Sequence, residues 1–203
     1  NTKLKEFSEE EIKIEPMLFR ADFDYAWKNG GSITREFLNN IHDCFRTSKI
    51  SIDSRVHMLM PGMYPCIPGW HHDDVPRTRS DKQPNYESPE YFSEHCLALW
   101  GDASLTEFAI GEHELEIPPI GHKIYKELSP QVEELCNNGT LQRFVAPERK
   151  MVYFDWQSWH RGTLATKRGF RFFIRATRNS LQPIKNEQRF NAQVYMPVIE
   201  EGW

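Results

Sequence analysis

The stretch that decides the fold class is FRFFIRA, residues 170–176, and shorter pieces of similar character precede it. Phe and Ile dominate this stretch, and both favour strands. The earlier pieces are Val56–Met60, Cys96–Trp100, Thr106–Ile110 and Met151–Phe154, and residues typical of turns lie between them. A series of short strands of this kind predicts a mainly β fold, either a sandwich or a barrel, with helical support.

Two helices are expected beside these strands. After a turn at Gly30–Ser32, apolar residues recur at helical spacing up to about Ser48, and either Ser32 or Thr34 is placed to cap this helix. The apolar face is made by Phe37, Leu38, Ile41, Cys44 and Phe45. A second helix is expected over Ile124–Cys136.

The length of the chain, 203 residues, is typical of one domain with a sizeable core. We therefore expect a single domain over residues 1–203, with the β core at about 55–176 and helical support at about 17–50. Residues 1–16 are polar and acidic and are expected on the surface.

Composition and charge narrow the choice of partner and compartment. The net charge of −4 does not indicate a nucleic-acid partner, although it does not exclude one. The stretch Arg143–Arg189 is rich in Arg and Lys, which permits an anionic ligand, but a solvated surface is the simpler interpretation. The four cysteines form no CxxC pair, and no apolar run has the length of a membrane span. With no signal-peptide pattern at Asn1, a cytoplasmic protein is expected.

The segment PGWHHDD, residues 68–74, carries the first candidate metal ligands. If it is a strand, His71 and Asp73 point to the same face, because strand side chains alternate. His160 offers a third ligand beyond the Met151–Phe154 piece. Two His and one carboxylate on one side of an ion form the facial triad of non-haem iron(II) oxygenases, which leaves coordination positions open. His72 and Asp74 have the same spacing on the opposite face, so the register stays open.

A basic residue is needed if the open positions take 2-oxoglutarate and dioxygen. Chelation through the keto-acid end leaves a second carboxylate pointing away from the metal, and an Arg fork matches a carboxylate well. Arg171 follows His160 by eleven residues within a strand-like stretch, and Arg175 lies four residues further on the same face. Either is a candidate anchor, because an Arg among bulky apolar residues is costly to bury without an anion.

Taken together, His71-x-Asp73, the distal His160 and the Arg one strand later resemble the iron(II)/2-oxoglutarate-dependent dioxygenase superfamily. Trp70–Asp73 resembles the W-H-x-D form of phytanoyl-CoA-hydroxylase-like members, which favours His71 and Asp73 over the neighbouring pair. The stretch TEFAIGEH, residues 106–113, is similar to the T-x-F-x-P-G-S-H segment of those enzymes, with Ile110 in place of Pro and Glu112 in place of Ser.

The resemblance covers about residues 55–176 and implies a cupin-like jelly roll, the double-stranded β-helix. It implies iron(II) held by His71, Asp73 and His160, and 2-oxoglutarate held by Arg171 or Arg175. Thr106 is a candidate for a further contact with 2-oxoglutarate, although a strand threonine on a pleated surface is the simpler interpretation. The implied reaction couples decarboxylation of 2-oxoglutarate, with dioxygen, to hydroxylation of a small-molecule or side-chain substrate. An anionic substrate is permitted.

Two other interpretations remain open. One is a cupin-like metal-binding protein, or a metal-dependent enzyme that does not use 2-oxoglutarate, and such a protein would have no need of Arg171 or Arg175. The other is a catalytically inactive relative that serves as an interaction domain. A polar stretch after the metal candidates, residues 75–95, is a candidate lid or a surface insertion. The oligomeric state stays open.

Overall fold

The computed structural model describes residues 3–88 and 92–196, and strands in several antiparallel sheets make up most of its regular structure. The expectation of a mainly β fold is confirmed. In chain order, the elements are α1 (Glu9–Ile14), β1 (Met17–Phe19), α2 (Phe23–Asn29), α3 (Ser32–Asn40), α4 (Asp43–Arg46), β2 (Ile50–Leu59), β3 (Glu94–Trp100), β4 (Thr106–Ile110), α5 (Ile124–Asn137), β5 (Gln142–Val145), β6 (Val152–Asp155), β7 (Trp159–Gly162), β8 (Gly169–Arg178) and β9 (Glu187–Arg189).

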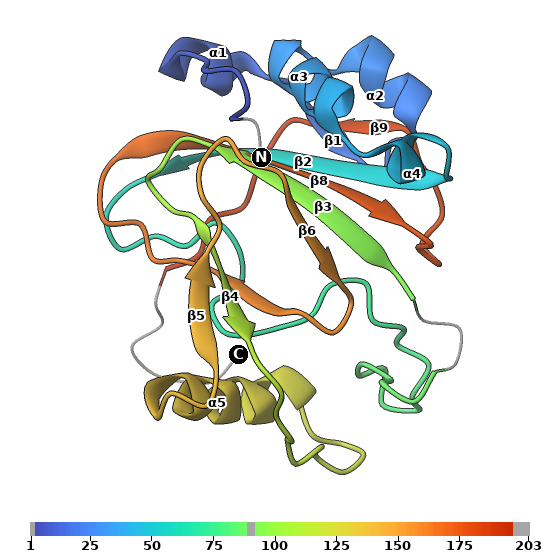
Figure 1. Ribbon diagram of the computed structural model, residues 1–203, viewed down its shortest axis with the longest axis vertical. Helices are drawn as coiled ribbons and strands as arrows, with labels where there is room; N and C mark the ends of the chain where they lie inside the picture. Colours follow the sequence, from blue (N-terminus) through green and yellow to red (C-terminus); the bar gives the residue numbers. More distant parts are fainter. Residues whose placement is uncertain (1–2, 89–91, 197–203) are drawn as a thin grey trace.

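Two sheets carry the architecture, and a short third sheet flanks them (Figure 1). The four-stranded sheet has the order β2-β8-β3-β6, and the three-stranded sheet has the order β5-β4-β7. An isolated antiparallel bridge between His71 and His160 extends the second sheet beyond β7. Strands β1 and β9 form the third sheet.

The β2–β8 ladder separates an apolar face from a polar one. Ile50, Ile52, Ile174 and Ala176 are buried, because side chains alternate along each strand and this set turns toward the helices. The intervening residues pair across the ladder as Ser51 with Thr177, Asp53 with Arg175, Arg55 with Phe173 and His57 with Arg171. This polar face is where the functional candidates of β8 lie.

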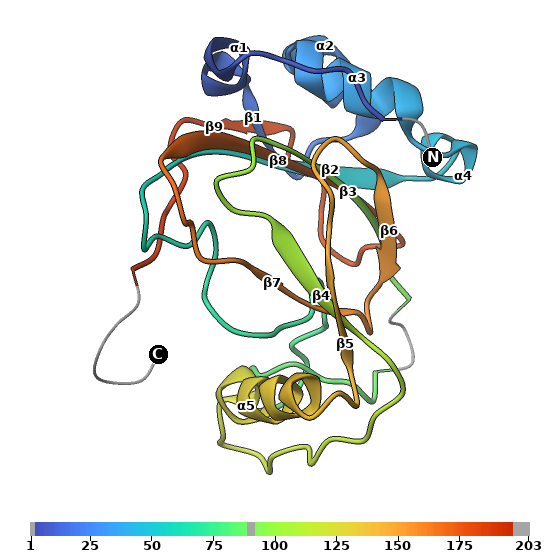
Figure 2. The same cartoon turned by 60° about the vertical axis from the view of Figure 1, so that its left-hand side comes forward.

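Helices cover opposite ends of the molecule. Helices α1 to α4 lie over the outer face of the four-stranded sheet, while α5 lies beside β4 and β5 (Figures 1 and 2). Ile33, Phe37 and Leu38 of α3 share a core with the apolar face of β2 and β8. Helix α5, which matches the expected second helix, packs Leu128 and Val132 into another core cluster. No helix of the described residues is both long and apolar enough to cross a bilayer.

The prediction that the helix after Ser32 continues to about Ser48 is wrong. Helix α3 ends at Asn40, because Ile41 takes an extended conformation with φ −69° and ψ 144°, and α4 is a separate turn. The side chain of Arg46 donates to the carbonyl oxygens of Leu38 (2.8 Å) and Ile41 (3.3 Å), which satisfies groups exposed by the break. Neither Ser32 nor Thr34 caps α3, whose N-cap is Gly31.

The expectation that residues 1–16 lie on the surface is also wrong in part. Leu4, Phe7 and Ile12 are buried in the core that lies under α3. Glu15 is buried as well, and its carboxylate accepts from the backbone N–H of Gly31 (2.8 Å) and Thr34 (2.9 Å). It thus supplies the cap that the helix itself lacks.

Most of the candidate lid, residues 75–95, is irregular structure that contacts the N-terminal end of α5. Asp81 accepts from Gly121 N (2.9 Å), and Gln83 accepts from Ile124 N (3.2 Å). The predicted C-terminal boundary of the candidate lid, residue 95, is wrong. Glu94 and the buried His95 already belong to β3. Residues 89–91 lie outside the described residues.

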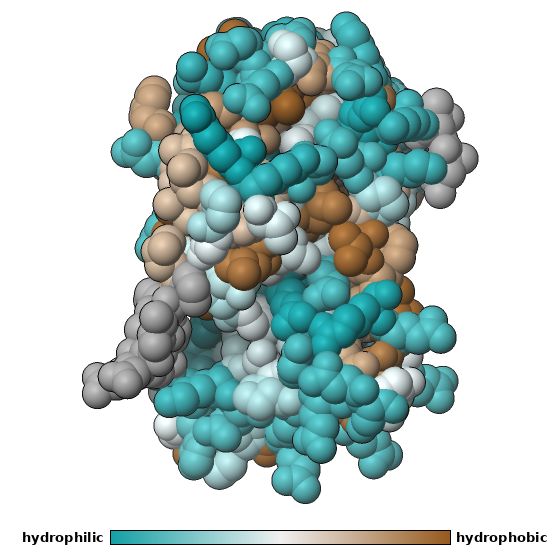
Figure 3. All heavy atoms as spheres, turned by 90° about the vertical axis from the view of Figure 1, so that its left-hand side faces the viewer, coloured by the Kyte–Doolittle hydropathy of each residue, from teal (hydrophilic) through white to brown (hydrophobic). Residues whose placement is uncertain are grey.

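Figure 3 shows that one face of the molecule carries apolar side chains in a band between hydrophilic regions.

Candidate metal centre and its cavity

The structure brings His71, Asp73 and His160 together. One ligand atom from each lies within 4.8 Å of the others, which is close enough for one ion to reach all three. His71 and His160 approach through the backbone bridge that joins residues 71 and 160. Asp73 reaches the group from a bend two residues later.

Backbone carbonyls orient both imidazole rings. His71 Nδ1 lies 3.0 Å from Gly69 O, and His160 Nδ1 lies 2.9 Å from Ser158 O. A carbonyl oxygen only accepts, so Nδ1 carries the hydrogen in each ring. Nε2 is then the atom with a lone pair available, and this is the arrangement that backbone carbonyls impose on metal-binding histidines when they accept from Nδ1.

Asp73 is the centre of the group. His160 Nε2 lies 3.0 Å from Asp73 Oδ2, and Arg175 pairs with that same oxygen. Because the Nδ1 hydrogen of His160 is already donated to Ser158, Nε2 and Oδ2 face each other as two potential acceptors. A positive charge between them, either a proton or a metal ion, resolves this contact.

Burial and neighbouring charges keep the ligand atoms available to a cation. Burial, and then His160, lowers the pKa of His71 to about 4, so its ring is neutral near pH 7. Burial alone would raise the pKa of Asp73, but Arg175 and then His160 hold it well below its usual range. A neutral imidazole at His71 and an ionised carboxylate at Asp73, with the second ring of His160 beside them, suit a divalent transition metal.

The structure separates the two possible registers of the HHDD run. His72 turns away from the triad, with its ring centroid 3.8 Å from that of Trp159 and its Nδ1 3.1 Å from the Tyr86 hydroxyl. Asp74 has a positive φ of 60° and lies outside the triad. The strand expected here is reduced to the single bridge at His71, so a bend, not strand alternation, places Asp73.

Trp70 fixes the backbone just before the first histidine. Its ring is buried, its Nε1 donates to Glu133 (2.7 Å), and its backbone N donates to the Ser129 hydroxyl (2.9 Å). Both partners belong to α5. The guanidinium of Arg161 lies 4.2 Å from the Trp70 ring centroid and pairs with Glu133 at 2.8 Å. These contacts hold the loop against α5, so that His71 is presented in one position.

The triad opens into a cavity of about 1290 Å³ that Arg171 and Thr106 also line. Arg171 is buried, and its guanidinium donates to Ser104 O (2.7 Å) and to the Thr106 hydroxyl (3.3 Å). Both acceptors are uncharged. Burial lowers the pKa of Arg171 to about 10, so it stays positive near pH 7. No Asp or Glu of the described residues pairs with it.

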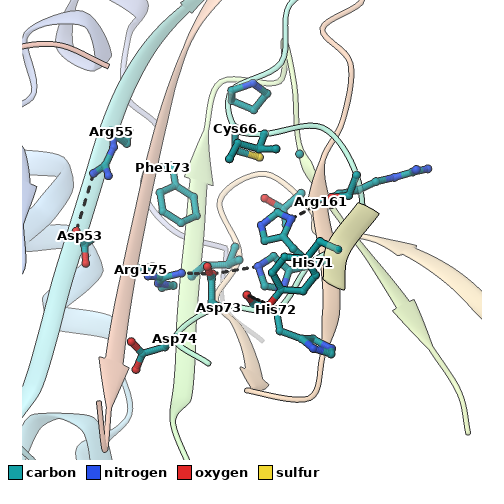
Figure 4. A pocket seen from close by; sticks show the side chains of 18 of the residues that line it. Asp53, Arg55, Cys66, His71, His72, Asp73, Asp74, Arg161, Phe173 and Arg175 are labelled. Carbon is teal, nitrogen blue, oxygen red and sulfur yellow. Dashed lines mark hydrogen bonds and ion pairs between the residues drawn. The ribbon is translucent and has the colours of Figure 1, made fainter. Parts of the chain in front are cut away.

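The two candidate anchors therefore differ in their surroundings. Arg175 is paired with Asp73, and Figure 4 shows it pointing from β8 at that carboxylate. Arg171 has only neutral partners, although a buried cation is expensive without an anion. Of these two arginines, Arg171 is therefore the one whose charge an anionic ligand would balance.

The other histidines fall into two kinds. His113 accepts from Trp159 Nε1 (2.9 Å), and His122 is exposed near Glu127, so both lie outside the triad in structural or surface positions. His95 is buried between Ser93 and Thr177. His57 is buried and lines the cavity opposite Arg171, and its Nδ1 has no hydrogen-bond partner in the described structure.

Several cavity residues were not predicted from the sequence, and two of them are arginines beside Asp53. Arg55 of β2 and Arg189 of β9 line the cavity beside Asp53 (Figure 4 shows Arg55 and Asp53). The alternation of Ile50, Ser51, Ile52 and Asp53 could have indicated that Arg55 shares a polar face. Nothing local to Arg189 indicates its position, because β9 reaches the cavity only by pairing with β1.

Comparisons of the chain with family models, with curated proteins and with solved structures gave no match.

Proposed function

We propose that the protein is an oxygenase that uses iron(II) and 2-oxoglutarate, with a jelly-roll fold, and that it hydroxylates a second substrate. The observation that carries the proposal is the uncompensated guanidinium of Arg171 in the same cavity as the His71, Asp73 and His160 triad. A metal site alone would not need that charge, whereas a chelating keto acid brings a second carboxylate with it.

The order of strand pairing supports a jelly roll. The antiparallel pairs are β2 with β8, residue 71 with β7, β3 with β6, and β4 with β5. Between β2 and β8, the first segment thus pairs with the last, the second with the last but one, and so on inward, while β3 with β8 and β4 with β7 join these pairs into two sheets. This nesting is what results when one long hairpin is rolled into two facing sheets, which is the jelly-roll plan.

The residues of the site fit the two groups that the proposal requires. His71 Nε2, His160 Nε2 and an oxygen of Asp73 would hold the metal, and Arg171 with the Thr106 hydroxyl would hold the distal carboxylate of 2-oxoglutarate. When bound, iron(II), 2-oxoglutarate and dioxygen supply the chemistry, in which one oxygen atom enters succinate and the other enters a C–H bond of the substrate, with release of carbon dioxide.

The protein's own contribution is orientation and charge. The carbonyls of Gly69 and Ser158 fix the tautomers of the ligand rings. Arg175 keeps Asp73 ionised. The hydrogen bond between Arg171 on β8 and Thr106 on β4 links the two sheets beside the position proposed for the cosubstrate.

Calorimetric titration of 2-oxoglutarate into anaerobic protein, with and without iron(II), tests the proposal. The wild type should bind only with the metal present. Arg171→Gln should weaken binding by about 2 kcal/mol or more, since a charged bidentate contact is lost. Arg175→Gln separates the two anchors, and Arg168→Gln is the matched control, because Arg168 is exposed.

Each alternative has its own signature in that experiment. If Arg175→Gln abolishes 2-oxoglutarate binding while Arg171→Gln does not, the anchor is misassigned. If the wild type binds iron(II) but not 2-oxoglutarate at millimolar concentration, the oxygenase proposal fails and the cupin-like metal protein takes its place. Production of succinate from 2-oxoglutarate by the iron-loaded wild type, and not by Asp73→Asn, completes the test.

A further inference from the structure

The cavity is strongly basic in a chain that is acidic overall. Nine Arg or Lys residues and three Asp residues line it, whereas the net charge of the whole chain is −4. Iron(II) and 2-oxoglutarate carry equal and opposite charges, so their binding would leave this excess unchanged. The excess of positive charge therefore favours a further anion in the cavity.

The basic side chains are not equivalent. Arg161 is paired with Glu107 and Glu133, and Arg77, Lys123 and Lys126 are solvent-exposed. Arg55 and Arg189 are different, because their side chains are only 25% and 31% exposed and they share one carboxylate, that of Asp53. The N···O distances to Asp53 are 4.0 Å and 3.9 Å, which are too long for hydrogen bonds.

The other contacts of Arg189 supply little negative charge to balance its guanidinium. Its guanidinium stacks on the ring of Phe19, 3.8 Å from the centroid, and its Nε is buried without a hydrogen-bond partner. The guanidinium of Arg20 lies 5.1 Å from the centre of the same ring. Three guanidinium groups thus gather at one end of the cavity around the loosely held carboxylate of Asp53, with Glu187 near Arg189 and Asp74 near Arg20 as further acidic neighbours.

We propose that Arg55, Arg189 and Arg20 form an anion subsite that binds a phosphate group of the second substrate. Phosphate is favoured over carboxylate because its three terminal oxygens and nearly double charge match several guanidinium forks, whereas a carboxylate has only two oxygens. That the bound molecule is a substrate rests on the proposed oxygenase function. The subsite itself rests on the arginines alone.

The subsite lies within the reach of a small molecule from the triad. Asp53 is opposite Arg175 in the β2–β8 ladder, and Arg175 contacts Asp73. Arg55 is two residues along β2, on the same face, which is roughly 7 Å further. Phe173 lies opposite Arg55 and also lines the cavity, so it offers an apolar wall to the carbon skeleton between the phosphate and the metal.

Titration of inorganic phosphate into the metal-free protein tests the subsite without iron or 2-oxoglutarate. The wild type should bind phosphate, and succinate should bind at least tenfold more weakly at this site. Arg55→Gln and Arg189→Gln should each weaken phosphate binding at least tenfold. Arg171→Gln and the surface control Arg168→Gln should stay within twofold of the wild type. Circular dichroism checks folding, and Arg55→Lys replaces Arg55→Gln if the latter does not fold.

Four results would overturn the proposal: no phosphate binding by the wild type at tens of millimolar, unchanged binding in both Arg55 and Arg189 variants, a loss confined to Arg171→Gln, or equal affinity for succinate and phosphate. The third would place the anion at the proposed cosubstrate anchor. Failure of 2-oxoglutarate to bind the iron-loaded wild type is a separate result, which would remove the oxygenase proposal and leave the phosphate measurement intact.

Discussion

The guanidinium of Arg175 is paired with the carboxylate of Asp73, although the two residues lie 102 positions apart in the chain. The pair has two opposing effects on a metal at Asp73. Arg175 repels a second cation, but it is also the main neighbour that keeps the buried carboxylate ionised. Which of these two effects dominates depends on pH. Arg175 helps metal binding only at a pH at which Asp73 would be protonated without it.

We therefore predict that Arg175→Gln makes metal binding pH-dependent. Without the cation, burial raises the pKa of Asp73, so protons compete with the metal as the pH falls. Manganese(II) affinity of the variant should fall about tenfold more than that of the wild type between pH 7 and pH 5. Anaerobic calorimetry at three pH values measures this. Parallel pH profiles for the two proteins would show that Arg175 does not control the ionisation of Asp73.

Asp73→Asn and Asp74→Asn form a matched pair that tests the register of the ligand run. An amide at Asp73 removes the charge between His160 and Arg175, so manganese(II) affinity should fall by roughly 100-fold, or about 3 kcal/mol. The same change at Asp74, which lies outside the triad, should leave the affinity within threefold of the wild type. The reverse result would assign the site to His72 and Asp74.

The buried histidines should make the protein sensitive to mild acid. Burial lowers the pKa of both His57 and His95 to about 3 in the folded chain, whereas an unfolded histidine titrates near 6.5. Between these values the unfolded chain binds more protons, so the free energy of unfolding falls as the pH drops below about 6.5. Each of the two contributes about 1.4 kcal/mol per pH unit.

Urea unfolding at pH 7.5, 6.5 and 5.5 checks this dependence. His95→Gln should reduce the slope of the free energy of unfolding against pH by the contribution of one histidine, because Gln does not titrate. His122→Gln is the control, since the His122 side chain is 53% exposed, and it should keep the slope of the wild type. A wild-type stability that is constant over this range would contradict the prediction.

Trp70 should be a major contributor to stability as well as to the position of His71. Trp70→Ala empties a fully buried site and leaves Glu133 without the indole donor, which should cost about 3–5 kcal/mol. Trp27, which is 42% exposed, provides the control, and Trp27→Ala should cost much less. Urea unfolding measures both. Equal losses in the two variants would mean that the Trp70 cluster does not stabilise the loop before His71.

Much of the β framework could be predicted from the sequence. The pieces Cys96–Trp100, Thr106–Ile110 and Phe170–Ala176 lie in β3, β4 and β8, because dense runs of strand-favouring residues leave little alternative. Strands β5 and β7 were not predicted. Each has four residues, and such short strands are defined by their pairing with β4 and not by their own composition.

The candidate site could be narrowed but not completed from the sequence. Spacing could nominate either His71 with Asp73 or His72 with Asp74. The resemblance of Trp70–Asp73 to a W-H-x-D motif favours the first pair, and the structure brings that pair together with His160. Likewise, Arg171 and Arg175 share a face of one strand, and no local pattern indicates that Asp73 pairs with the second and not the first. Their roles toward a metal and a cosubstrate stay predictions.

Because β2 has one face in the core and the other in the cavity, it should not tolerate insertions or deletions. A one-residue insertion near Asp53 would turn the following Ser54 and Val56 toward the cavity, and would drive Arg55 and His57 into the core beneath the helices. The same insertion in the largely exposed loop at residues 114–121 would displace neither set. Insertions and deletions tolerated in a library of variants should therefore collect in that loop and be absent from β2.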